Sequence, residues 1–70
     1  MLWERASSTN ISEVGFDPTT SELQVRFRSG ATYRYVGIPE SLWQQFKETG
    51  FSGRFLNTDI KGLYEYERLI

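Results

Sequence analysis

The 70-residue sequence contains no cysteine and no histidine. This excludes disulfides, thiolate nucleophiles, imidazole acid–base catalysis and the ordinary zinc sites, because each of them needs one of these side chains. Carboxylates alone can hold magnesium or calcium, but Asp17 and Asp59 are isolated and neither opens a series of acidic ligands. We therefore expect no metal, no cofactor, no catalytic residue and no enzymatic activity.

Long apolar segments are also missing. No run approaches the roughly 20 residues that a membrane-spanning helix needs, and the opening MLWERASS lacks the basic-then-apolar order of a signal peptide. We therefore expect a cytoplasmic protein. The net charge is only −1, so the surface as a whole does not predict strong, sequence-independent binding to nucleic acid.

Aromatic residues, in contrast, are abundant: five Phe, four Tyr and two Trp. A chain of this length makes one domain, whose core rarely supplies more than roughly 3 to 5 kcal/mol of net stability. Large aromatic side chains can compensate for the small core, because each buries a large area. Basic residues are concentrated between Glu22 and Glu40, where Arg26, Arg28 and Arg34 occur without any acidic residue.

The first half of the sequence predicts a tail followed by three strands. Residues 1–7 read as a tail that docks through Trp3 or frays, and a single domain is expected over residues 8–70. Apolar residues from Ile11 onward indicate an extended segment that ends near Asp17, where Pro18 begins turn chemistry. Strict alternation over residues 23–28 predicts a half-buried second strand, and residues 32–36 form a third.

The loop between the second and third predicted strands decides which way Tyr33 and Tyr35 face, because a one-residue shift of register reverses every side chain. A two-residue turn at Ser29-Gly30 would place both tyrosines on the arginine face. A three-residue loop, Arg28-Ser29-Gly30, would place them on the core face. We favour the second, since it needs a left-handed conformation only at the glycine. One face then carries Leu23, Val25, Phe27, Tyr33 and Tyr35, and the other carries Gln24, Arg26, Arg28, Thr32, Arg34 and Val36.

The second half predicts two helices and a last strand. Pro39 suits the first turn of a helix that ends near Thr49, before Gly50, and its apolar stripe is Leu42, Trp43 and Phe46. Ser52 can cap a second short helix. Residues 63–68 alternate Tyr and Glu as a strand would. The expected fold is α+β, a small antiparallel sheet of β-β-β-α-α-β order with the helices packed on one face and the arginines on the other.

The segments STNISEVGFD, LQVRFRSGATYRY, IPESLW and FSGRFLNTDIKGLYEYERL, in this order and spacing, resemble the KTSC domain. This small module is named for its occurrence at the C-terminus of some lysyl-tRNA synthetases, and it also occurs as free-standing bacterial and phage proteins. Tyr33-Arg34-Tyr35 is similar to the family's central Tyr-x-Tyr, and the segment 52–57 to its later Ser/Asn segment. Phe16 departs from the tyrosine usual in the family, which leaves no hydroxyl there. The resemblance covers residues 8–69 and implies RNA binding.

Three functional hypotheses remain open. The first is a non-enzymatic module that binds RNA or single-stranded nucleic acid, with arginines on phosphates and aromatic side chains on bases. The second is a protein that binds or sequesters a small anionic nucleotide at a helix start. The third is a protein-interaction module or homodimer that uses exposed Trp3, Tyr66, Leu69 and Ile70. The candidate ligand-binding residues of the first two hypotheses are Arg26, Arg28, Tyr33, Arg34, Tyr35, Ser52, Arg54, Asn57 and Lys61.

Overall fold

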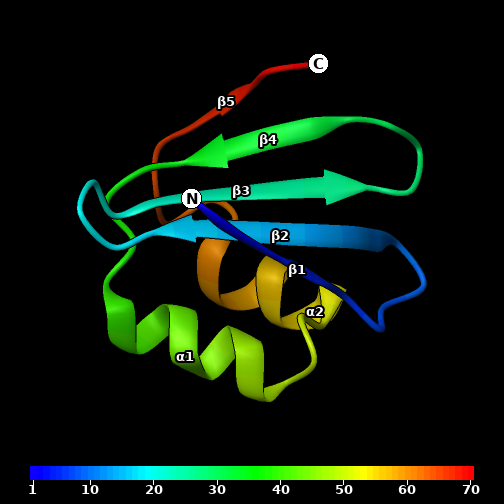
Figure 1. The fold of residues 1–70 in the computed structure, drawn as a ribbon, viewed down its shortest axis with the longest axis horizontal. Helices are drawn as coiled ribbons and strands as arrows, with labels where there is room; N and C mark the ends of the chain where they lie inside the picture. Colours follow the sequence, from blue (N-terminus) through cyan, green and yellow to red (C-terminus); the bar gives the residue numbers. More distant parts are fainter.

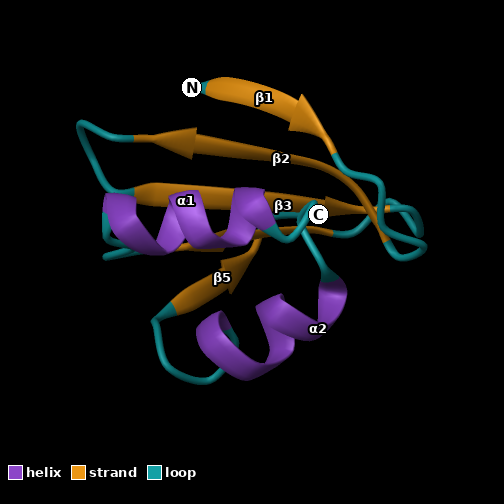
Figure 2. Cartoon of the chain, turned by 90° about the horizontal axis from the view of Figure 1, so that it is seen from below, coloured by secondary structure: helices purple, strands orange, loops and turns teal.

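The computed structural model describes residues 1–70 as an antiparallel sheet with helices on one face (Figures 1 and 2). The sheet has five strands in the order β1-β2-β3-β4-β5, so neighbours in the chain are neighbours in the sheet. The elements are β1 Leu2–Arg5, β2 Ile11–Asp17, β3 Glu22–Phe27, β4 Thr32–Tyr35, α1 Glu40–Glu48, α2 Gly53–Phe55, the π-helical turn η1 Leu56–Ile60 and β5 Tyr66–Arg68. The predicted α+β class is confirmed.

The β3–β4 hairpin has the predicted three-residue loop. Phe27 N donates to the Ala31 carbonyl at 2.8 Å, and Gly30 N donates to the Phe27 carbonyl at 2.9 Å. Gly30 has a φ of +98°, which a residue with a Cβ rarely adopts. Val25 is therefore opposite Tyr33 and Leu23 is opposite Tyr35. Both tyrosines lie on the face that the helices cover.

The segment interpreted as a tail forms the first strand of the sheet. Residues 2–5 pair with β2 in a register that sets Trp3 opposite Gly15, and an ion pair of 3.0 Å joins Glu4 to Lys47 of α1. The sheet therefore has one strand more than predicted, and residues 2–5 are part of the domain. A four-residue strand is too short to show a periodicity of its own, so its pairing with β2 decides its conformation.

Helix α1 begins and ends where the sequence predicts. Pro39 is its N-cap and Gly50 follows it with a φ of +73°. Trp43 stacks on Phe16 of the sheet with ring centroids 5.1 Å apart, and Phe46 is fully buried. The apolar stripe thus packs on the sheet as expected. None of the helices combines the length and apolar character needed to cross a membrane.

The last strand is shorter than predicted. The chain turns at Gly62, whose φ is +85°, and β5 begins only at Tyr66. Tyr66 is opposite Tyr35 and Glu67 is opposite Arg34, so the predicted separation of tyrosine and glutamate holds within the strand itself. Thr32 was expected on the solvent-facing side but is only 3% exposed. Backbone hydrogen bonds from Leu69 and Ile70 to its carbonyl bring the end of the chain against it.

Candidate functional site

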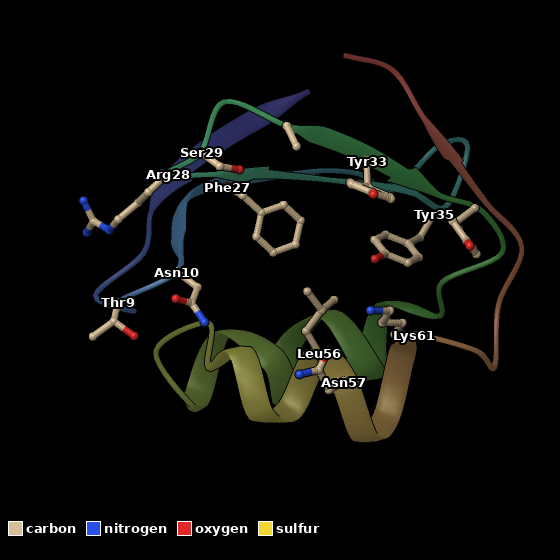
Figure 3. A pocket seen from close by; sticks show the side chains of 12 residues that line it. Thr9, Asn10, Phe27, Arg28, Ser29, Tyr33, Tyr35, Leu56, Asn57 and Lys61 are labelled. Atoms are coloured by element: carbon tan, nitrogen blue, oxygen red, sulfur yellow. The ribbon is translucent and has the colours of Figure 1, made fainter.

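A cleft of about 540 Å³ lies between the helix-facing side of the sheet and the α2–η1 segment (Figure 3). Phe27 points into it from the sheet, and Leu56 and Lys61 point into it from the helical side. Its lining contains no acidic residue and consists of Thr9, Asn10, Phe27, Arg28, Ser29, Ala31, Tyr33, Tyr35, Leu56, Asn57, Lys61 and Tyr66. The cleft is thus a concave, partly apolar space of a size that suits a small ligand.

Aromatic rings form the sheet side of this cleft. The Tyr33 ring meets Phe27 edge-on at 5.8 Å and lies 5.9 Å from the Tyr66 ring, which is also 5.9 Å from Tyr35. Tyr35 is 2% exposed and Tyr66 is 57% exposed. Burial raises the pKa of Tyr35, and the nearby Tyr33 and Tyr66 raise it further. Tyr66 therefore offers an accessible ring face. Tyr35 packs against it as a buried, neutral phenol.

Polar groups without partners also line the cleft. The side chains of Asn10 and Asn57 make no hydrogen bond within the chain, and Lys61 makes no ion pair. Arg28, in contrast, donates from Nε and Nη2 to the Ser8 carbonyl, both at 3.2 Å, and points away from the cleft (Figure 3). Two amides and one ammonium are thus available to a ligand, whereas Arg28 holds the loop between β1 and β2.

A second, polar compartment adjoins the cleft. It has a volume of about 550 Å³, and no hydrophobic residue lines it. Its walls are the β1–β2 loop, the end of α1 and the α2–η1 segment. The lining residues are Ser7, Ser8, Thr9, Asn10, Thr49, Gly50, Ser52, Gly53, Arg54 and Asn57. Thr9, Asn10 and Asn57 line both spaces. The two spaces therefore adjoin along these three residues, and together they are called the groove.

The predicted ligand residues separate into two groups. The cleft brings Tyr33, Tyr35, Asn57 and Lys61 together, with Arg28 at its edge and pointing away. The polar compartment brings Ser52, Arg54 and Asn57 together. Sequence reasoning missed Asn10, which lines both spaces. No local signal marked it, because Asn10 and Asn57 come to line the same spaces only through the fold.

Arg26 and Arg34 do not belong to the groove. Both lie on the other face of the sheet, where Arg26 forms an ion pair with Glu13 and its guanidinium carbon lies 4.6 Å from the Trp3 ring centroid. Arg34 pairs with Glu67 at 2.8 Å. The expected surface of three cooperating arginines is therefore not formed, because Arg28 has turned to the β1–β2 loop and the other two are neutralised by their neighbours.

Two of the backbone N–H groups at the start of α2 already have partners. Ser52 Oγ accepts hydrogen bonds from Arg54 N at 3.2 Å and from Phe55 N at 3.4 Å. The predicted capping role of Ser52 is thus confirmed. The same hydrogen bonds leave these two backbone groups unavailable to a phosphate, so an anion here would need side-chain donors as well.

The residues expected at an interface lie at opposite edges of the sheet. Trp3 belongs to β1, whereas Tyr66 belongs to β5 and Leu69 and Ile70 follow it. They cannot form one patch on a single protomer. Homodimer formation stays a prediction, which light scattering tests.

Comparisons with known proteins agree on one family. The model of the KTSC domain matches residues 7–66. An uncharacterised protein of Stutzerimonas stutzeri is 36% identical over 63 residues, which are 89% of each chain. A lysine–tRNA ligase of Nostoc sp. is 32% identical over 54 residues, which are 77% of this chain but 10% of the ligase.

A solved structure agrees with this match. The crystal structure of a KTSC domain protein from Yersinia pestis superposes with a TM-score of 0.88 at 34% sequence identity, and the superposition covers 99% of this chain and 97% of the other. The likeness therefore extends over the whole sheet and both helices. This chain belongs to the KTSC domain family.

Proposed function

We propose that this chain is a non-enzymatic module that binds RNA or single-stranded nucleic acid by holding a base in the aromatic cleft. The observation that carries the proposal is the accessible Tyr66 ring in a cleft that the unpartnered amides of Asn10 and Asn57 also line. A base can stack on an aromatic side chain, which is worth about 1–3 kcal/mol. Side-chain amides can donate to and accept from the exposed edges of an unpaired base.

Charge and family support the same proposal. Lys61 points into a cleft that no carboxylate lines, so an anionic backbone meets no repulsion there. Three relatives carry the name lysine–tRNA ligase, and that name refers to an RNA substrate. The chain spans about a tenth of these ligases, so the ligase reaction itself is not part of the proposal.

A free anionic nucleotide is a second candidate ligand. The cleft volume of about 540 Å³ lies within the usual range for small-molecule sites, about 300–1,000 Å³. Both ligands present a base and a phosphate, so the same groups of the cleft would recognise them. They differ only in whether the nucleotide is free or belongs to an RNA chain.

Fluorescence anisotropy with a labelled ten-nucleotide single-stranded RNA tests the proposal. We expect Tyr66→Ala to weaken binding by about tenfold, the equivalent of one lost stacking interaction. Tyr66 is exposed and its replacement should leave the fold intact. The control is Arg26→Ala combined with Arg34→Ala, which should leave affinity and salt dependence unchanged because both arginines are outside the cleft.

Two results would contradict the proposal. One is wild-type protein that binds none of the RNA at low salt. The other is a Tyr66→Ala variant that binds like wild type while the double arginine variant does not, which would place the site on the other face. Competition with free mononucleotides separates the two candidate ligands, because a sequestering protein would prefer them to the RNA.

A further inference from the structure

The aromatic cleft and the polar compartment meet at a common wall. Asn10 and Asn57 line both of them, one from the β1–β2 loop and one from η1. A Cβ built on Gly53 would be in van der Waals contact with Ser8 Oγ at 3.9 Å and with Asn10 Nδ2 at 4.0 Å, so the two walls approach closely at this glycine and a larger side chain would fill the junction. Because Asn10 and Asn57 line both spaces, a ligand that contacts them can reach from the cleft into the polar compartment.

The polar compartment is rich in hydrogen-bond donors. Arg54 is exposed and makes no ion pair, and its side chain makes no hydrogen bond within the chain. Ser8 Oγ already accepts from Asn10 N at 3.2 Å and from Ile11 N at 3.4 Å. Ser52 Oγ likewise accepts two backbone N–H groups. The lone pairs of both hydroxyls are thus occupied, while their protons remain free to donate.

This donor set matches a phosphate. A phosphate oxygen only accepts hydrogen bonds, and an arginine guanidinium with neighbouring hydroxyl and amide donors binds it through charge-assisted hydrogen bonds. No acidic residue lines the compartment, so nothing in it repels an anion. The aromatic cleft offers the complementary chemistry for the base.

We infer that the polar compartment is the phosphate subsite of the same ligand whose base occupies the aromatic cleft. Arg54 is its cation, and Asn10 and Asn57 contact the ligand at the junction between base and phosphate. The inference rests on the proposed function, and it specifies a nucleotide rather than a nucleoside as the unit that is recognised. Arg26 and Arg34 take no part in it.

Calorimetry with the four ribonucleosides and their 5′- and 3′-monophosphates measures the contribution of the phosphate. For the best-bound base, we expect one monophosphate to bind at least about tenfold more tightly than its nucleoside, as a charge-assisted contact should provide. Arg54→Ala should remove this advantage and leave nucleoside binding unchanged. Arg54→Lys should restore part of it. Arg26→Ala is the matched control, because it removes an arginine from the other face.

A second variant tests the space rather than the charge. Gly53→Leu keeps Arg54 but directs a side chain toward Ser8 and Asn10, so it should also remove the phosphate advantage. Gly53 has no positive φ, so the substitution brings no backbone strain. Circular dichroism and thermal melting of each variant establish that it is folded.

Binding to the ten-nucleotide RNA completes the test. Arg54→Ala should lower the slope of log affinity against log salt by about one, as the loss of one phosphate contact does. If the protein binds the RNA but no mononucleotide, the recognised nucleotide is part of a chain. The salt slope of Arg54→Ala then tests the phosphate subsite. If Arg54→Ala leaves the phosphate advantage or the salt slope unchanged, the phosphate subsite is wrong, but the proposal of base binding in the cleft stands. Wild-type protein that binds no probe overturns the proposed function and the subsite together.

Discussion

Trp3 lies across Gly15, the residue opposite it on the neighbouring strand. A Cβ at position 15 would approach Trp3 Cδ2 to 2.9 Å and Met1 Sδ to 2.8 Å, so the indole occupies the space of the missing side chain. An aromatic residue that covers a glycine on the adjacent strand pins the register of the two strands. This contact explains why a segment as short as β1 joins the sheet.

Gly15→Ala should therefore destabilise the protein by displacing Trp3. We expect a loss of about 1–3 kcal/mol in the free energy of unfolding, the usual cost of overpacking, measured by denaturant titration. In a Trp3→Ala background the same substitution should cost clearly less, because the ring that it meets is gone. Equal costs in both backgrounds would show that the ring is not the reason for the glycine.

Gly30→Ala should cost about 1–2 kcal/mol, for a different reason. No atom lies within 4 Å of a Cβ at this position, so only the left-handed backbone conformation is penalised. Gly30→Asn should cost less, since asparagine tolerates positive φ better than alanine does. Ser29→Ala, one residue earlier, is the control and should be nearly neutral. Thermal unfolding of the three variants distinguishes these outcomes.

Ser52→Ala should destabilise the start of α2 by about 1 kcal/mol, because it removes the side-chain acceptor of two backbone N–H groups. Amide hydrogen exchange provides the local readout: Arg54 and Phe55 should exchange faster in the variant. If only global stability falls and these two amides exchange as before, the serine acts through some other contact. Ser29→Ala serves again as a matched serine without a capping role.

Stability should fall at high pH because of Tyr35. Burial raises the pKa of Tyr35 above its ordinary value of 10.0, so the folded protein binds this proton more tightly than the unfolded chain does. The resulting stabilisation is complete below pH 10 and is lost as the pH rises through the folded-state pKa. Tyr35→Phe should flatten this decline, and ultraviolet titration should lose a tyrosine whose pKa is raised. Tyr66→Phe should reduce the decline only in part, because burial is the larger cause of the raised Tyr35 pKa and Tyr66 a smaller one.

Local sequence signals correctly predicted the features that depend on neighbouring residues. The left-handed requirement at Gly30, together with strict alternation before it, predicted the hairpin register and hence the inward direction of Tyr33 and Tyr35. Pro39, Gly50 and Ser52 marked the helix ends, because capping involves residues only a few positions apart.

The differences between the sequence-based prediction and the structure come from contacts between residues far apart in the chain. Residues 2–5 were expected to be a tail, since nothing within LWER shows that Gly15 is left bare for Trp3. Arg28 was grouped with Arg26 and Arg34 by alternation, but the strand ends at Phe27 and Arg28 turns to the Ser8 carbonyl. Alternation predicts a side-chain direction only while the strand continues.

Four features follow from the sequence alone, because they depend on residues close together or on the order of motifs: the α+β class, the β3–β4 register, the helix ends and the resemblance to the KTSC family. Two others depend on the folded chain: Asn10 and Asn57, which are 47 positions apart, line the same groove, and Arg26 and Arg34 lie outside it. Asn10 and Asn57 come to line the same groove because of the way α2 and η1 pack against the sheet, and the buried contacts of the whole core determine that packing.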